Sequence, residues 1–200
     1  MTVVTIDLGT SACKVQAFDD DGNELRSYSR EIETAHPRPD WAEQDPESWW
    51  KAVVSGVRNC GQDVQGATKC RAICVCSHRE SVFPVDRRGK VLAPCMLWAD
   101  RRGEAEAEEL AREFGGEVHQ RTGMKADPYF TAPKLLWLKR NRPELIPRIH
   151  KFLLPKDFIV HRLTGEWSTD WTVASRTMML DLRRMDWWPE VLEYVGADGD

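Results

Sequence analysis

No run of apolar residues in this sequence approaches the roughly 18 residues that a membrane-spanning helix requires. The N-terminal stretch MTVVTIDLGT lacks the basic region and the cleavage site of a secretory signal, so we expect it to form the first strand of a cytoplasmic protein. The sequence also lacks a surplus of positive charge. Its net charge of -4 gives no attraction to nucleic acid or to an anionic membrane surface, and neither is expected as a partner.

Motifs of several common sites are absent as well. Without G-x-x-x-x-G-K-[ST] or G-x-G-x-x-G, neither a Walker-type phosphate loop nor a dinucleotide-binding fold is expected. The six cysteines include no C-x-x-C pair, and His78 completes no known zinc spacing. Cys70, Cys74 and Cys76 fall in the apolar segment CRAICVC, which predicts a buried strand with free thiols rather than metal ligands.

The N-terminal third is rich in strand patterns. Alternating residues predict strands over 2–8, 13–19 and 24–33, with the last two joined by a tight turn at Asp21-Gly22. Such an order predicts an antiparallel meander. With no repeats, low-complexity tracts or linkers in the sequence, we expect one compact α/β unit.

A helix is predicted next, because Asp45 suits an N-cap and Pro46 suits the first helical position. Trp50 and Val53 are spaced to share the face that packs on the sheet, so Trp50 is expected in the core. Further strands are predicted over 70–77, 81–86, 90–97 and 151–154, and helices over 103–114, 131–149 (broken by two prolines), 155–165 and 186–196.

The segment DLGTS joins the first two predicted strands. The amides of Gly9, Thr10 and Ser11 can form a nest that binds an anion. Asp7 would repel a bare phosphate, but it fits if a hydrated Mg²⁺ lies between the two. An ordinary hairpin, with Asp7 bonded to the turn amides, explains the same residues, and both interpretations stay open on spacing alone.

Eight segments are informative together: IDLGTSACKV, PDWAEQDPESWW, SHRES, LWADRR, TGMKADPYF, FTAPKLLW, LLPKDFIVHRLTGEWSTD and ASRTMMLDLRRMDW. In this order and spacing they resemble the N-terminal lobe of the FGGY family of carbohydrate kinases, and IDLGTSACKV resembles the first phosphate motif of that family. PDWAEQDPESWW, FTAPKLLW and LLPKDFIVHRLTGEWSTD are similar to xylulokinases, whereas SHRES, LWADRR, TGMKADPYF and ASRTMMLDLRRMDW are more similar to glycerol kinases. The resemblance covers residues 1–200 and implies a ribonuclease-H-like (actin-like ATPase) lobe, with a mixed sheet flanked by helices.

The resemblance also implies a site for a sugar or polyol. Arg79 and Glu80 stand where glycerol kinases carry the Arg-Glu pair that binds adjacent hydroxyls, whereas xylulokinases carry Met-His there. Charged partners strengthen such hydrogen bonds, and we expect the two side chains to hold each other in place. A surface ion pair of little energetic value is the alternative. Trp98 resembles the tryptophan that forms an apolar wall against the carbon chain of the polyol. Tyr129 matches the tyrosine whose hydroxyl completes the pocket.

Six other residues are candidates for the same cleft. We expect His78 to be a polar residue of the cleft, with a proton carrier as the alternative, and Arg176 is a further candidate to reach the substrate. Asp100 and Arg101 are expected to fix the loop below the pocket, with a sugar contact as the alternative. Lys134 and Lys156 are expected on helix faces, with a position near a phosphate as the alternative.

For the reaction, the resemblance implies ATP and Mg²⁺, with Asp7 reaching the metal through water. The catalytic base of the family is an aspartate in a Gly-Asp segment, which we expect beyond Asp200 because Gly199-Asp200 follows too closely on the preceding helix. The adenosine pocket is expected in a second lobe, outside this chain. The chain alone is therefore expected to contain no catalytic residue, and to bind substrate weakly without turnover.

Two other classes compete with the kinase hypothesis. A non-catalytic polyol- or sugar-binding module would keep Arg79, Glu80, Trp98 and Tyr129 but would give Asp7 no metal to bind. A glycoside hydrolase needs two paired carboxylates, and no pattern in the sequence pairs any two acids. Glycerol-like polyols and xylulose both stay open as substrates. We also expect apolar surface that a second lobe would cover to favour self-association.

Overall fold

The computed structural model describes residues 2–61 and 70–199, which divide into two compact units. Unit 1 is built from Met1–Thr34, Gln44–His78 and Pro155–Ser168, and unit 2 from Ala35–Glu43, Arg79–Leu154 and Thr169–Asp200. The absence of linkers predicts a single unit, whereas the structure has two. Each unit gathers segments that are far apart in the sequence, so no linker marks the boundary between them.

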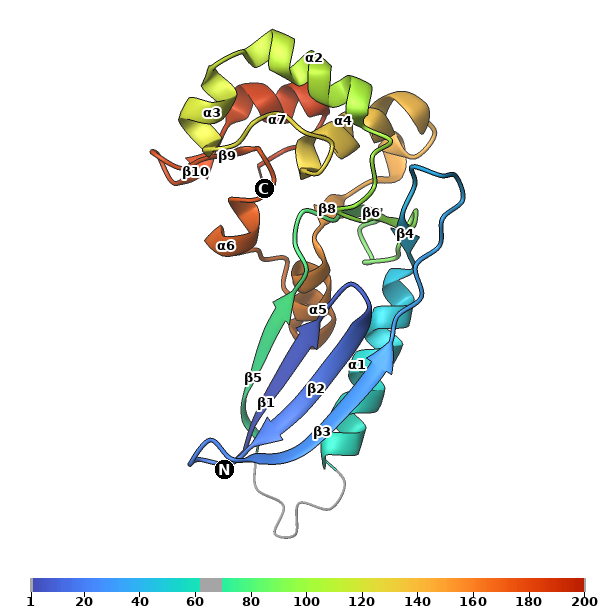
Figure 1. The fold of residues 1–200 in the computed structure, drawn as a ribbon, viewed down its shortest axis with the longest axis vertical. Coiled ribbons are helices and arrows are strands. Elements are labelled where there is room, and N and C mark those ends of the chain that lie inside the picture. The colour runs from blue at the N-terminus through green and yellow to red at the C-terminus, as the bar shows by residue number, and fades with distance from the viewer. Residues whose placement is uncertain (1, 62–69, 200) are drawn as a thin grey trace. The chain divides into compact units, whose positions relative to one another are not determined.

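The sheet of unit 1 has four strands in the order β3-β2-β1-β5. Strands β1 (Thr2–Leu8), β2 (Ala12–Phe18) and β3 (Glu24–Glu31) form the predicted antiparallel meander, and β5 (Cys70–Ser77) pairs with β1 in parallel. The sheet is therefore mixed, as expected (Figure 1). In the turn between β2 and β3, Gly22 alone takes a positive φ, of 84°.

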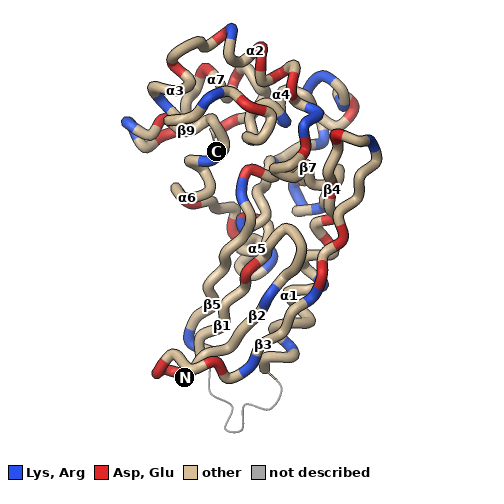
Figure 2. Tube along the Cα trace, in the orientation of Figure 1, with Lys and Arg blue, Asp and Glu red and all other residues tan. Residues whose placement is uncertain are grey.

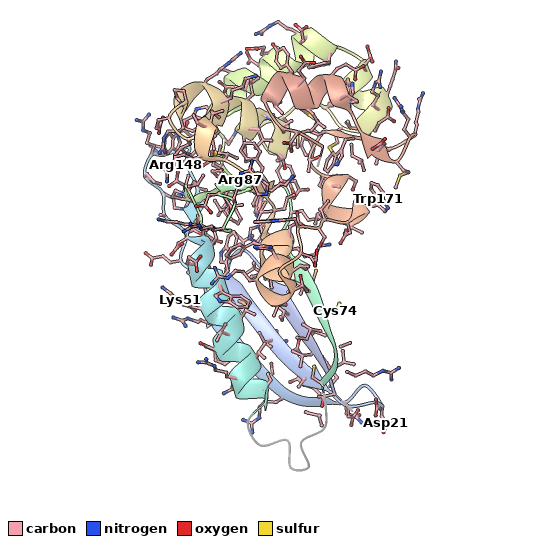
Figure 3. All side chains as sticks on the ribbon, turned by 180° about the vertical axis from the view of Figure 1, so that it is seen from behind. Asp21, Lys51, Cys74, Arg87, Arg148 and Trp171 are labelled. Carbon is pink, nitrogen blue, oxygen red and sulfur yellow. The ribbon has the colours of Figure 1, made fainter. Side chains whose placement is uncertain are left out.

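Two helices cover one face of this sheet, and they lie in front of it in Figure 3. Helix α1 (Pro46–Gly61) packs against the meander, and α5 (Pro155–Thr164) packs against β5 and α1. The Asp45 carboxylate accepts a hydrogen bond of 3.0 Å from the amide of Glu47, as expected of an N-cap residue.

The prediction that Trp50 lies in the core is wrong by one position. Trp49 is the fully buried tryptophan, with 0% of its surface exposed, and its indole N–H donates to Gln44 Oε1 over 2.9 Å. Trp50 is half-buried beside the guanidinium of Arg162. Both tryptophans fit a helical period with neighbouring apolar residues, so the pattern could not choose between them.

The prediction that β5 is a buried strand is also wrong. Cys70, Cys74 and Cys76 are exposed, and only Val75 and Ser77 are half-buried (Cys74 is labelled in Figure 3). The side chains of β5 are exposed because of where the strand lies. Strand β5 is at the edge of the described sheet, and the two helices described in this unit lie on one face of that sheet. Its apolar composition therefore does not lead to burial.

Unit 2 is mainly helical. Its helices are α2 (Glu104–Phe114), α3 (Glu117–Thr122), α4 (Thr131–Asn141), α6 (Trp171–Ala174) and α7 (Pro189–Val195), with a 3-10 turn η1 (Ile146–Arg148). Helix α4 ends two residues before Pro143, as a proline requires. The short helices α3 and α6 carry too few periodic residues to be predicted from the sequence.

Three short two-stranded sheets complete the fold. Strand β6 (Phe83–Val85) pairs with β8 (Lys151–Leu153), β4 (Glu43–Gln44) with β7 (Cys95–Met96), and β9 (Leu180–Asp181) with β10 (Asp186–Trp187). The strand expected over 90–97 is therefore reduced to two residues. The core of unit 2 consists of apolar side chains, among them Val82, Met96, Leu110, Leu135, Met178, Trp188 and Leu192.

Basic and acidic residues are interspersed along the chain in both units (Figure 2). Among residues 2–61 and 70–199, no helix is both long and apolar enough to cross a bilayer.

Candidate functional site

The predicted phosphate-binding turn lies between β1 and β2 in unit 1. The amide of Gly9 donates to the carbonyl of Ala12 over 2.9 Å, which closes the turn. A Cβ atom at Gly9 would lie 3.1 Å from that same oxygen, so the tight turn favours glycine. The Gly9 amide therefore has a backbone acceptor within the turn, and the anion nest expected at Gly9, Thr10 and Ser11 stays a prediction.

A buried glutamine supports this turn, and sequence reasoning missed it. Gln44 donates from Nε2 to the carbonyl of Thr10 over 2.7 Å and to the hydroxyl of Thr34 over 2.9 Å. Its Oε1 accepts from the indole of Trp49. The full set of hydrogen bonds fixes the amide orientation, and therefore the backbone of Thr10.

Asp7 lies near the end of β1 with its side chain exposed. Its register partners are Lys14 on β2 and Cys76 on β5, both exposed. One accessible carboxylate matches what a hydrated Mg²⁺ needs, because this ion keeps most of its waters and takes one or two carboxylates beside phosphate oxygens. In the described residues, no group of three His, Cys, Asp or Glu side chains is placed to hold a metal ion.

His78 ends unit 1, directly after β5. Its amide donates to the carbonyl of Leu8 over 2.8 Å, and its ring meets the Trp49 ring edge-on, with centroids 5.5 Å apart. Burial lowers the pKa of His78 to about 4, so the imidazole is neutral at pH 7. The role of His78 as a polar residue of the substrate cleft stays a prediction.

The predicted substrate residues that follow His78 belong to unit 2. Glu80 is 2% exposed, and its Oε1 accepts a hydrogen bond of 2.6 Å from Nε of Arg176. Among the described residues, Arg79 makes no ion pair with Glu80, and its side chain is exposed. The expectation that Arg79 and Glu80 hold each other is therefore wrong: the partner of Glu80 comes from a segment 96 positions away.

Trp98 and Tyr129 lie together, as the resemblance implied. Their ring centroids are 5.7 Å apart, and Trp98 is 37% exposed, so one side of the pair is open to solvent. The amide of Trp98 donates to the hydroxyl of Ser81 over 3.0 Å, next to Glu80 in the chain. The Thr131 hydroxyl, two residues after Tyr129, donates to the Glu80 carbonyl. These links bring Glu80, Trp98 and Tyr129 to one place within unit 2.

Lys134 holds the segment that carries Tyr129. Its side chain is fully buried, and its ammonium group donates to the carbonyls of Pro128, Tyr129 and Phe130 at 2.6, 2.7 and 3.1 Å. Burial lowers the pKa of Lys134 to about 7, while the nearby Asp100 carboxylate acts in the opposite direction. The expectation of an ordinary helix-face lysine is corrected, because all three N–H donors point at backbone oxygens.

A second buried group fixes the loop after Trp98. The carboxylate of Asp100 accepts from the amide of Ala42 over 2.7 Å and from the Arg102 side chain over 2.8 and 2.7 Å. Arg102 also pairs with Glu43 at 2.6 Å, and its guanidinium lies 3.6 Å from the ring centroid of Trp41. Asp100 thus has the structural environment expected of it. The sequence analysis missed Arg102, since two of its partners, Glu43 and Trp41, are distant in sequence.

Chemically, the cluster of unit 2 offers a held carboxylate beside an open aromatic pair. A carboxylate accepts hydroxyl protons, and an aromatic face covers the carbon chain between those hydroxyls. In unit 1, the turn after Asp7 offers backbone amides and one carboxylate, a set that suits a metal-bound phosphate.

The model of the FGGY family of carbohydrate kinases, N-terminal domain, matches residues 2–200. This chain belongs to that family. It is 36% identical to the xylulose kinase of Escherichia coli (strain K12) over 198 residues, and 35% identical to the glycerol kinase of Thermococcus gammatolerans over 199 residues. These alignments cover 98% and 97% of the chain and 40% of each relative.

The fold agrees with this assignment. The crystal structure of a gluconate kinase from Lactobacillus acidophilus matches with a TM-score of 0.92 and 28% identity, over 99% of this chain and 40% of that one. The FGGY chain described here therefore has the actin-like ATPase fold of its relatives and spans about two fifths of their length.

Proposed function

We propose that this chain is the substrate-binding lobe of an ATP-dependent carbohydrate kinase, which transfers phosphate to a hydroxyl of a sugar or polyol. One observation carries the proposal: the Glu80 carboxylate is held by Arg176, in a segment linked to Trp98 through Ser81 and to the Tyr129 segment through Thr131. Phosphoryl transfer depends mainly on positioning the acceptor hydroxyl, because ATP-Mg²⁺ supplies the transferred group. A hydrolase or a dehydrogenase would need further catalytic groups beside this arrangement.

In this proposal, two hydroxyls of the substrate donate to Glu80, and Arg79 donates to their oxygens from the exposed side. Trp98 covers the carbon chain, and the Tyr129 hydroxyl bonds a further oxygen. The carboxylate at Glu80 favours linear polyols such as glycerol, while the relatives add xylulose and gluconate as substrate classes.

Asp7, Thr10 and Ser11 are proposed to receive the phosphate side of the reaction. The two amides would bind phosphate oxygens, and Asp7 would bind waters of the Mg²⁺ ion. When bound, ATP-Mg²⁺ supplies the phosphoryl group and spreads its developing charge. We place the catalytic base and the adenosine pocket in a second lobe outside this chain, and we expect the whole protein to be cytoplasmic.

Binding by the isolated chain tests the acceptor site. We expect at least one of glycerol, erythritol, ribitol, xylitol and xylulose to raise the melting temperature, because a ligand of the folded form stabilises it. Glu80→Gln should abolish the increase, and Glu108→Gln on the exposed face of α2 should not. If no compound shifts the unmodified chain, the acceptor site is misassigned.

A second measurement separates a kinase lobe from a purely sugar-binding module. Addition of ATP-Mg²⁺ should perturb the amide NMR signals of Thr10 and Ser11, and Asp7→Asn should weaken the perturbation. A sensor module would leave these signals unchanged. ADP release by the 200-residue chain with substrate and ATP-Mg²⁺ should stay at background, and turnover would show that the base lies within the chain.

A further inference from the structure

The partner of Glu80 gives Arg176 a role that the sequence did not assign. The two side chains meet through a single hydrogen bond of 2.6 Å between Arg176 Nε and Glu80 Oε1. Glu80 is buried, whereas 32% of the Arg176 side chain is exposed. Within the described residues, Glu80 Oε2 accepts no hydrogen bond, so one carboxylate oxygen is committed and the other is left for a ligand.

The backbone around this pair is unusually constrained. Glu80 has a φ of 64° and Met178, two residues after Arg176, has a φ of 65°. Such values are uncommon for a residue with a side chain and persist where the surrounding structure holds them. The start of α4 bonds to both segments, because the Thr131 hydroxyl donates to the Glu80 carbonyl and the Ala132 amide donates to the Thr177 carbonyl.

Arg176 lies in a well-defined turn directly after the end of α6. Asp170 caps that helix by accepting from two amides, and the amide of Arg176 donates to the carbonyl of Val173. Its guanidinium carbon lies 5.3 Å from the centroid of the Phe130 ring, directly after Tyr129. The side chain is therefore held on two sides, by a carboxylate and by an aromatic ring.

We propose that Arg176 is a positioning residue: its hydrogen bond to Oε1 holds the Glu80 carboxylate and turns Oε2 toward the substrate. The proposal rests on the proposed function, because it assigns Glu80 the substrate hydroxyls.

The charges near Glu80 explain why Arg176 is needed. A carboxylate removed from water without a partner takes up a proton, and the resulting acid can no longer accept two hydroxyl protons in the same way. Two other cations lie close by. Lys134 on α4 has its three donors committed to carbonyls, and Arg79 precedes Glu80 with an exposed side chain. Arg176 is the cation that bonds to the carboxylate directly.

The test uses Arg176→Met in the 200-residue chain, with polyol affinity measured by calorimetry from pH 5 to pH 8. The polyol is whichever of glycerol and xylitol binds the unmodified chain more tightly. Unmodified chain should change its affinity less than about twofold over this range. The variant should bind about tenfold more weakly at pH 5 than at pH 8, because a buried carboxylate that loses its paired cation takes up a proton more readily.

Two further variants make the result specific. Arg121→Met is the matched control, because Arg121 also pairs with a buried carboxylate, Asp181, and lies over a tryptophan ring in unit 2. It should leave both affinity and pH profile unchanged. Arg176→Lys keeps the charge but not the fixed Nε geometry, so it should weaken binding while keeping a flat pH profile.

The outcomes separate the two proposals. If the unmodified chain binds neither polyol, the proposed function fails. If it binds and Arg176→Met shows the same affinity and the same flat profile, the role of Arg176 is overturned while the proposed function stands. Should Arg176→Met not fold, Arg176→Lys decides, and an affinity equal to that of the unmodified chain would contradict the proposal.

Discussion

Lys134 and Tyr129 are joined by a hydrogen bond of 2.7 Å, from the lysine ammonium group to the tyrosine carbonyl oxygen. The same ammonium group bonds the carbonyls on either side, at Pro128 and Phe130. A lysine ammonium has three donors, and all three are used here. The position of the Tyr129 backbone in the predicted pocket therefore depends on a side chain that is itself inaccessible to any ligand.

Replacement of Lys134 by methionine should lower the free energy of unfolding by about 3 kcal/mol at pH 6, because three buried carbonyls lose their donor. At that pH the lysine, with its pKa of about 7, is mostly protonated. Urea unfolding measures the change. Lys139→Met, which removes an exposed bond to the Tyr194 carbonyl, is the control and should cost less than about 1 kcal/mol. Equal losses for both variants would contradict this account.

His78 predicts a pH dependence of stability. Burial holds its folded-state pKa at about 4, below its ordinary value of 6.5. As pH falls below 6.5 the unfolded chain binds the proton first, so stability should decline between pH 6.5 and pH 4 and then level off. The full difference corresponds to about 3 kcal/mol. His78→Phe should remove this part of the slope, and His119→Gln, at an exposed histidine, should not.

The two adjacent tryptophans of α1 should respond very differently to substitution. Trp49→Ala should destabilise the chain by about 3–5 kcal/mol, because it empties a fully buried site. Trp50→Ala removes a half-buried ring beside Arg162 and should cost about 1 kcal/mol. Guanidinium unfolding followed by circular dichroism compares them, and the reverse order would show that the helix is rotated relative to its assigned face.

Gly56 tests how closely α1 approaches the sheet. A Cβ atom there would lie 2.4 Å from a methyl carbon of Val15 and 3.0 Å from the Tyr28 ring. Gly56→Ala should therefore destabilise by about 1–3 kcal/mol, in spite of the better helix propensity of alanine. Gly61, in the last turn of the same helix, has open space around it. Gly61→Ala should be neutral or slightly stabilising, and a similar result at Gly56 would refute the close approach.

The six cysteines should divide into two classes of reactivity. Cys70, Cys74 and Cys76 are exposed on β5 and should react rapidly with a disulfide reagent in the native chain. The buried thiols should react only on unfolding: Cys13, Cys60 and Cys95. Burial also raises the pKa of Cys13 to about 11, which suppresses its thiolate. The chromophore released before and after addition of denaturant gives the number of accessible thiols and of buried thiols. If all six thiols react slowly in the native chain, the prediction of a buried β5 is restored.

Local patterns determined much of this fold. Alternation fixed the meander of β1, β2 and β3, and Asp45 with Pro46 fixed the start of α1, because these signals act between residues a few positions apart. The ordered set of family motifs then determined the family, and with it the residues Glu80, Trp98 and Tyr129. All three lie in unit 2, as close neighbours or linked through Ser81 and Thr131.

Tertiary structure alone decided which partner each of these groups has. Glu80 bonds Arg176 rather than its neighbour Arg79, and Lys134 turns inward to the Tyr129 segment instead of toward solvent. It also decided that the apolar strand β5 is exposed, since its burial depends on what packs beside it. A sequence specifies each residue's chemistry and local spacing, but pairing across about a hundred positions follows from packing, which no local period encodes.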